Sequence, residues 1–202
     1  MKTTTMNMFM AIAMTITTGM IERVSSAEPP AGTDNPAVQT RAIDKKVSDF
    51  PDRTDLSTPE AACAAWQRAS ASKDAQAISQ LSWIPLDPAQ LENQYRREEA
   101  RDAEGFAIYL KALAESKIVE VQIWRNNLAQ VVTYLPFPVG KGQSPFSART
   151  FGCIKGQWKN LGEDRLPTLE ATREYFTRKK DALWQRFEII RKNQRATATQ
   201  KY

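Results

Sequence analysis

Apolar residues recur every three or four positions from residue 59 to about residue 70, a period that predicts a helix. Ser57 and Glu60 mark its start, because their spacing fits a capping box, and Pro59 is tolerated in the first turn where an N–H is not needed. The expected buried stripe consists of Ala62, Trp66 and Ala69, with Cys63 beside it. Its small residues would allow close packing on a neighbouring element.

Two further helices are expected before the pattern changes. One covers residues 75–83 and is stopped by Pro85. The other begins with Asp87 as its N-cap. It has an interrupted apolar face, made of Leu91, Tyr95, Phe106, Tyr109, Leu110 and Leu113. Residues 96–104 are almost wholly charged, so we expect Gly105 to divide this helix, with the charged part projecting into solvent or acting as a mobile flap.

From residue 118 the period changes to two, which predicts β-strands. One face of the first strand carries Val119, Val121 and Ile123, and the other carries Glu120, Gln122 and Trp124. Asn126 and Asn127 indicate a turn into a strand over residues 128–135. A loop rich in Pro and Gly follows at residues 136–145. A second hairpin, residues 146–154 and 157–161, turns at Lys155-Gly156.

The last expected element is a helix capped by Thr168, followed by a polar tail from Gln194. Its apolar stripe is Phe176, Leu183, Phe187 and Ile190, which we expect to pack on the domain or on a second copy in a homodimer. Helices, a meander of about four antiparallel strands and a final helix together predict an α+β fold, with the N-terminal helices packed on a curved sheet.

Residues 1–27 have the pattern of a cleaved signal peptide. Lys2 gives a positive start, residues 6–21 are uncharged, and small residues at positions 25 and 27 suit cleavage before Glu28. We therefore expect export to the periplasm or the extracellular space. The remaining chain divides into a linker and irregular lead-in at 28–55, the α+β domain at 56–168 and a basic helix and tail at 169–202.

Basic charge is concentrated near the C-terminus, where residues 173–195 hold eight basic and three acidic side chains. In an intracellular protein such a segment would suggest a nucleic-acid partner. If the protein is exported, nucleic acid is excluded as a partner. The basic segment would then contact an anionic surface or an acidic protein, or would simply form a solvated helix face.

Two stretches carry a family resemblance: STPEAACAAWQRASASKDAQAISQLSW at residues 57–83, and FGCIKGQWKNLG at residues 151–162. Their order resembles the NTF2-like (cystatin-like) superfamily over roughly residues 56–178. The resemblance implies a curved sheet wrapped around a long helix, with a cone-shaped cavity used for catalysis, ligand binding or protein contacts. DKKVSDFPDRTDLSTPEAA, residues 44–62, is also similar to a segment that precedes such modules in exported or membrane-tethered bacterial regulatory proteins, which implies a sensory role.

The sequence contains no histidine, so the usual proton shuttle near neutral pH is missing, and we expect no metal or other cofactor. The residues expected to line the cavity are Trp66, Tyr109, Glu120, Trp124, Tyr134 and Trp158, although the tryptophans could equally form the core. We interpret the chain as a noncatalytic module that binds a small apolar ligand or a protein partner. The alternatives are a carboxylate-dependent enzyme, with Glu120 as the candidate acid or base, and a sensory or regulatory module.

Cys63 and Cys153 are the only cysteines of a chain expected to enter an oxidising compartment. A bridge between them would close a loop of about 90 residues and contribute on the order of 4 kcal/mol in the chain-entropy model. The alternative is two separate thiols in the core.

Overall fold

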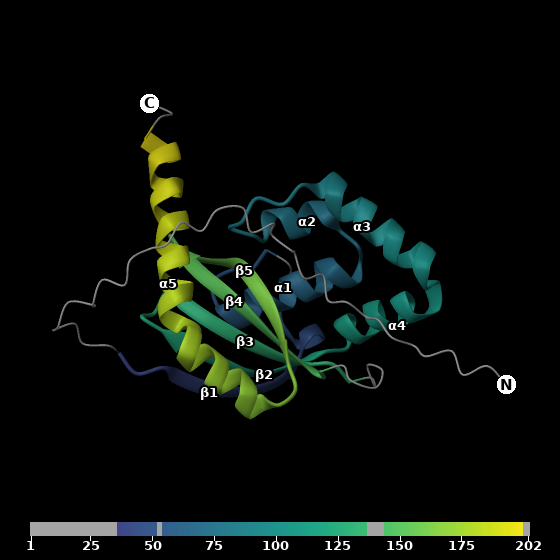
Figure 1. The fold of residues 1–202 in the computed structure, drawn as a ribbon, viewed down its shortest axis with the longest axis horizontal. Coiled ribbons are helices and arrows are strands. Elements are labelled where there is room, and N and C mark those ends of the chain that lie inside the picture. The colour runs from purple at the N-terminus through teal and green to yellow at the C-terminus, as the bar shows by residue number, and fades with distance from the viewer. Residues whose placement is uncertain (1–35, 52–53, 137–143, 200–202) are drawn as a thin grey trace, which may run out of the picture.

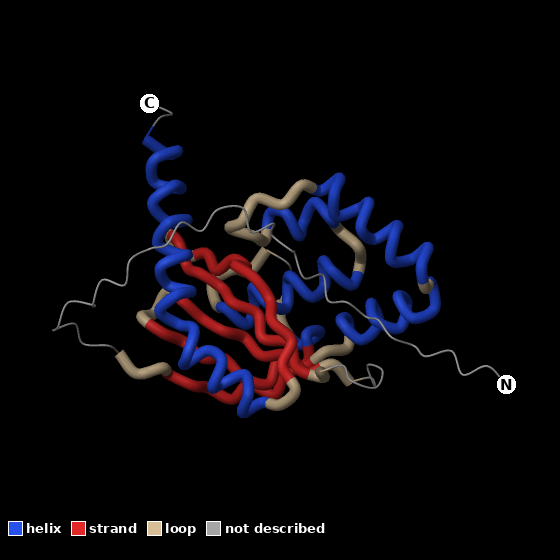
Figure 2. Tube along the Cα trace, in the orientation of Figure 1, coloured by secondary structure: helices blue, strands red, loops and turns tan. Residues whose placement is uncertain are grey.

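A computed structural model describes residues 36–51, 54–136 and 144–199. The proposed signal peptide and the first part of the linker lie outside the described residues, as does most of the loop after residue 136. The described chain forms three layers (Figures 1 and 2): four helices cover one face of an antiparallel sheet, and a long C-terminal helix crosses the other face. The expected α+β class is confirmed.

The sheet has five strands rather than about four, in the order β1-β2-β3-β4-β5. Their bounds are Gln39–Lys46 (β1), Lys117–Trp124 (β2), Leu128–Tyr134 (β3), Phe146–Ile154 (β4) and Gln157–Leu166 (β5). β1 lies in the segment expected to be an irregular lead-in, and it pairs with β2 along the edge of the sheet. A short 3-10 helix, η1 (Val47–Asp49), follows β1 and buries Val47. The domain therefore begins well before residue 56.

Four helices connect β1 to β2: α1 (Pro59–Ala71), α2 (Ala75–Gln80), α3 (Pro88–Arg101) and α4 (Ala103–Ala114). α1 is capped by Thr58, whose hydroxyl accepts a hydrogen bond from the amide of Ala61, and not by Ser57. The expected third helix is divided at Asp102, three residues before Gly105. Asp102 ends α3 and caps α4 by accepting a bond from the Gly105 amide, so the cap and not the glycine's flexibility divides the helix.

The alternating strand pattern places a separate core on each face of the sheet. On one face Val121, Ala129, Val131 and Phe151 pack against Ala62, Cys63 and Ala64 of α1. On the other face Trp124, Leu128 and Leu161 pack against Phe176 and Phe187 of α5 (Leu169–Thr199). The expectation that the C-terminal stripe packs on the domain is thus confirmed, and α5 continues through the residues expected to form a polar tail.

α5 lies very close to the sheet at Gly152. A Cβ atom at this position would come within 2.4 Å of the Phe187 ring, so only glycine allows the helix to approach at this distance. Polar contacts hold the start of the helix, because Gln130 donates to the carbonyl of Thr172 and Arg173 binds the buried carboxylate of Glu120. Among the helices of the described ranges, none is both long and apolar enough to cross a membrane.

Candidate functional site

A pocket of about 370 Å³ lies between α1–α4 and the β4–β5 edge of the sheet, and it continues around β5 to α5. Its walls are mainly apolar or aromatic, and include Trp66, Ile78, Ile84, Leu86, Leu91, Tyr95, Tyr109 and Leu113. Near α5 the lining changes to Tyr175, Leu183 and Arg186. This size and composition are typical of sites for small molecules.

A β-bulge in β5 shapes one wall of the pocket. Phe151 pairs with Asn160 and Thr150 pairs with Gly162, which leaves Leu161 without a partner in the ladder. Gly162 has a φ of 154°, which few residues other than glycine adopt, and its amide donates to the Asn160 side chain. The carbonyl of Asn160 also accepts the amide of Trp83, which ties the loop after α2 to this wall.

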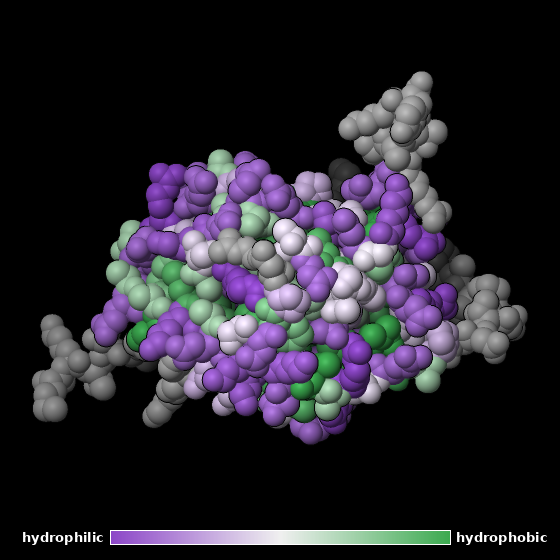
Figure 3. Space-filling view, turned by 180° about the vertical axis from the view of Figure 1, so that it is seen from behind, coloured by the Kyte–Doolittle hydropathy of each residue, from purple (hydrophilic) through white to green (hydrophobic). Residues whose placement is uncertain are grey.

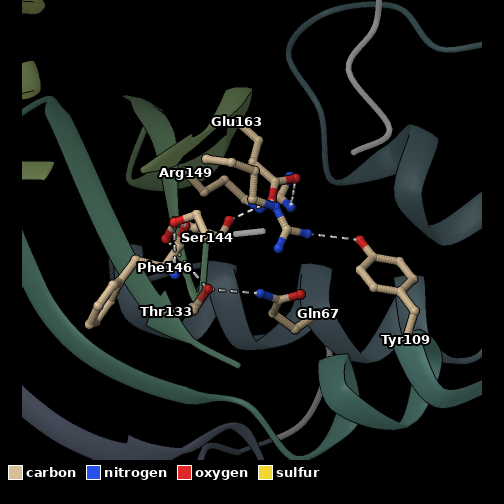
Figure 4. Close-up of polar contacts among 9 residues, drawn as sticks. Gln67, Tyr109, Thr133, Ser144, Phe146, Arg149 and Glu163 are labelled. Atoms are coloured by element: carbon tan, nitrogen blue, oxygen red, sulfur yellow. Dashed lines mark hydrogen bonds and ion pairs between the residues drawn. The ribbon is translucent and has the colours of Figure 1, made fainter. Parts of the chain in front are cut away.

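A buried cluster of charged side chains lies on the β4 and β5 side of the pocket, and Figure 4 shows its central ion pair. An Nη2 atom of Arg149 lies 2.5 Å from Oε2 of Glu163, its cross-strand neighbour. The other oxygen, Oε1, accepts the Ser147 hydroxyl and lies 3.2 Å from Nε of Arg165. Arg165 also donates to the Tyr109 hydroxyl on α4, so the cluster joins the sheet to the helical layer.

The charged state of Glu163 is favoured by its neighbours. Burial alone would raise the pKa of Glu163, but Arg149, Arg165 and the hydrogen bond from Ser147 outweigh burial and lower it. Burial would likewise lower the pKa of Arg165, and Glu163 together with Tyr109 raises it instead. An efficient general base has a pKa near the working pH, so this carboxylate is poorly suited to that role.

Two aromatic residues complete this part of the pocket. The guanidinium of Arg149 lies 4.8 Å from the centroid of the Trp66 ring, a cation–π contact that fixes its position. Tyr95, 4% exposed, lies against the Phe106 ring at 6.1 Å. Its hydroxyl has no hydrogen-bond partner in the described part of the chain, and burial raises its pKa.

The structure separates the six residues expected to line one cavity. Trp66 and Tyr109 line the pocket. Glu120 and Trp124 lie on the opposite face of the sheet, beneath α5, because alternate strand residues face opposite sides. There Glu120 is 2% exposed, accepts hydrogen bonds from Arg173 and Gln122, and has no access to the pocket.

The other two expected residues lie away from the pocket. Tyr134 is 37% exposed at the end of β3, where its ring contacts Phe146. Trp158 belongs to the core beneath α1, with Phe151 and Cys63. For Trp124 and Trp158 the structure agrees with the alternative that tryptophans build the core.

Both cysteines are free thiols in this structure, and no bridge joins them. Cys63 is buried on α1, and the partly buried Cys153 packs against the same core cluster, as the shared strand parity with Phe151 suggested. Burial raises the pKa of Cys63 to about 12, which makes it a poor nucleophile at neutral pH.

Comparison of the chain with models of protein families, with curated proteins and with solved structures finds no match. The site must therefore be interpreted from its own chemistry. In the described ranges no group of three or more Cys, Asp or Glu side chains is arranged to hold a metal ion. Seen from behind the view of Figure 1, the surface is largely hydrophilic, with hydrophobic side chains in separate areas (Figure 3).

Sequence reasoning missed Arg149, Glu163 and Arg165. One indication was available, because Ser147, Arg149 and Phe151 share a parity in the second hairpin, which places two polar residues on the face of a core phenylalanine. Glu163 and Arg165 lie in the part of β5 that extends beyond the predicted strand end at residue 161.

Proposed function

We propose that this chain is a noncatalytic, exported NTF2-like module that binds one small, mainly apolar ligand in the pocket between α1–α4 and the β4–β5 edge. The observation that carries the proposal is the pocket itself, with about 370 Å³ of space and walls built from aromatic and aliphatic side chains. Its position between N-terminal helices and an antiparallel sheet agrees with the NTF2-like resemblance of residues 57–83 and 151–162. Export rests on the pattern of residues 1–27.

The absence of catalysis is supported by the chemistry of the groups in this pocket. The sequence has no histidine, and the buried carboxylate of Glu163 is held in its ionised form by two arginines. Glu120, the candidate for a carboxylate mechanism, lies under α5 on the other face of the sheet. A binding role therefore fits the available groups better than acid–base chemistry does.

The proposal can be tested with N-phenyl-1-naphthylamine, a neutral apolar dye whose fluorescence rises in apolar sites. We expect one dye per chain, with energy transfer from tryptophan, since Trp66 lines the pocket. Ser70→Phe, which fills the pocket from α1, should weaken binding at least tenfold. Thr177→Phe places the same ring on the exposed side of α5 and should leave binding unchanged. Absence of dye binding, or equal binding by wild type and Ser70→Phe, would refute the proposal.

A further inference from the structure

The charged cluster beside the pocket contains one more positive than negative group. Arg149 and Arg165 share the single carboxylate of Glu163, and the side chains of these three residues are 6%, 19% and 11% exposed. Both carboxylate oxygens already have partners, since Oε1 accepts from Ser147 and Oε2 from Arg149. A buried guanidinium without a matching anion is unfavourable, so this cluster favours the arrival of a negative charge.

Arg149 also has donors for which the described residues supply no acceptor. Of its three guanidinium nitrogens, only Nη2 has a hydrogen-bond acceptor among the described residues, and Nε is buried without one. The hydroxyl of Tyr95 is buried and likewise unpartnered in the described chain, and both residues line the pocket. Buried polar groups are almost always satisfied, so unused donors at a pocket wall point to an acceptor supplied by a ligand.

The nearby carboxylates are engaged elsewhere. Asp164 also lines the pocket, but it accepts the Tyr175 hydroxyl at 2.7 Å on the side of α5. Asp74 accepts the amide of Ala77 as the cap of α2. Among the described residues, no hydrogen bond or ion pair joins Asp164 to Arg149. The positive charge of Arg149 is therefore directed toward the pocket, where the Trp66 ring supports it from one side.

We propose that the ligand carries one anionic head group, of the carboxylate or sulfonate type, on a compact apolar body, with the head group bound by Arg149 and the body held among the aromatic and aliphatic walls. This inference rests on the proposed function, because it assigns the chemistry of the same pocket. Planar head groups of this kind accept paired hydrogen bonds from a guanidinium, which gives both strength and orientation.

A matched pair of dyes tests the assignment. 8-Anilinonaphthalene-1-sulfonate has the ring system of N-phenyl-1-naphthylamine with an added sulfonate, so the two differ in the anionic group alone. Wild type should bind both at the same site, and the sulfonate dye should displace the neutral dye one for one. Wild type should bind the sulfonate dye more tightly than the neutral dye. This difference in affinity should persist in 0.5 M NaCl, since salt screens a buried ion pair much less than a surface one.

Arg149→Met should weaken binding of the sulfonate dye at least tenfold more than it weakens binding of the neutral dye. Arg97→Met, which removes an equal charge from the exposed face of α3, should change neither. Glu163→Gln keeps the size of the side chain but removes the carboxylate that neutralises the arginines, so the affinity for the sulfonate dye should rise at least threefold. This variant tests the inference even if Arg149→Met does not fold.

Three outcomes overturn this inference while leaving the pocket function in place. They are binding of the neutral dye alone, an equal loss of both dyes in Arg149→Met, and unchanged or weaker sulfonate binding in Glu163→Gln. If the neutral dye does not bind wild type, the proposed function itself fails.

Discussion

Replacing Gly152 by alanine tests how closely α5 packs on the sheet. The new Cβ would lie 2.4 and 2.5 Å from two atoms of the Phe187 ring and 3.1 Å from Leu161. Ordinary contacts between carbon atoms are about 3.5–4.0 Å long, so the ring would have to move by roughly 1 Å. Phe187 is fully buried and contacts the Trp184 ring, which leaves it little room to move.

The expected loss of stability follows from two opposing effects. Overpacking of a filled core costs about 1–3 kcal/mol. Alanine restricts the unfolded chain more than glycine does, which returns about 0.4–1 kcal/mol. Gly152→Ala should therefore lower the free energy of unfolding by about 1–2 kcal/mol and the Tm by about 2–8 °C for a domain of this size.

Urea unfolding of a double-mutant cycle measures the effect directly. In a Phe187→Leu background the ring is absent, so Gly152→Ala should no longer destabilise the protein, and the coupling energy should equal the overpacking cost of about 1–3 kcal/mol. Gly156→Ala is the control, because Gly156 has a φ of 76° with no neighbouring atom within 4 Å, and its strain cannot be relieved at Phe187. Zero coupling, or a Gly152→Ala protein as stable as wild type, would refute the packing argument.

Three further predictions concern buried titratable groups. Because the pKa of Glu163 is lowered in the folded state, its contribution to stability is complete above its usual pKa near 4.5 and is lost as the pH falls through the folded pKa. In Glu163→Gln, the free energy of unfolding, measured in urea between pH 3 and 7, should therefore fall less steeply toward acid pH than in wild type. An unchanged pH dependence would contradict this. Arg173→Met leaves Glu120 buried without its cation and should lower the Tm. Adding Glu120→Gln should recover part of this loss. A double variant no more stable than Arg173→Met would contradict a stabilising Arg173–Glu120 ion pair. With Ellman's reagent at pH 8, Cys153 should react before Cys63, and the denatured, unreduced protein should show two thiols per chain, while none in a monomer would indicate a bridge.

Local patterns predicted most of the elements correctly. The change of period near residue 118 gave the β2–β3 hairpin, and Gly156 marked the next turn, where its φ is 76°. Errors arose where long-range contacts decide the outcome. β1 has seven of eight residues exposed, so it carries almost no apolar pattern, and its strand conformation depends on pairing with β2.

The pocket cluster could not be predicted for a related reason. Arg149 and Glu163 meet only because β4 and β5 pair in a register that includes the bulge at Leu161. A register shifted by one residue would move every side chain of β5 to the other face. Glu120 was assigned to the correct face of its strand. Whether that face lines the pocket or lies beneath α5 could not be decided before the position of α5 was known.

The long chain segment between β1 and β2 predicts that this edge of the sheet forms on a different timescale from the rest. β2 to β5 are joined as consecutive hairpins, whereas Gln39 meets Ile123 across about 80 residues of intervening chain, so this edge must wait for α1–α4 to assemble. We expect β1 to be the last strand to join and the first to detach. Amide hydrogens in the β1–β2 ladder should then exchange with solvent faster than those between β3 and β4, and each such opening would expose the backbone edge of β2 without dissolving the rest of the domain.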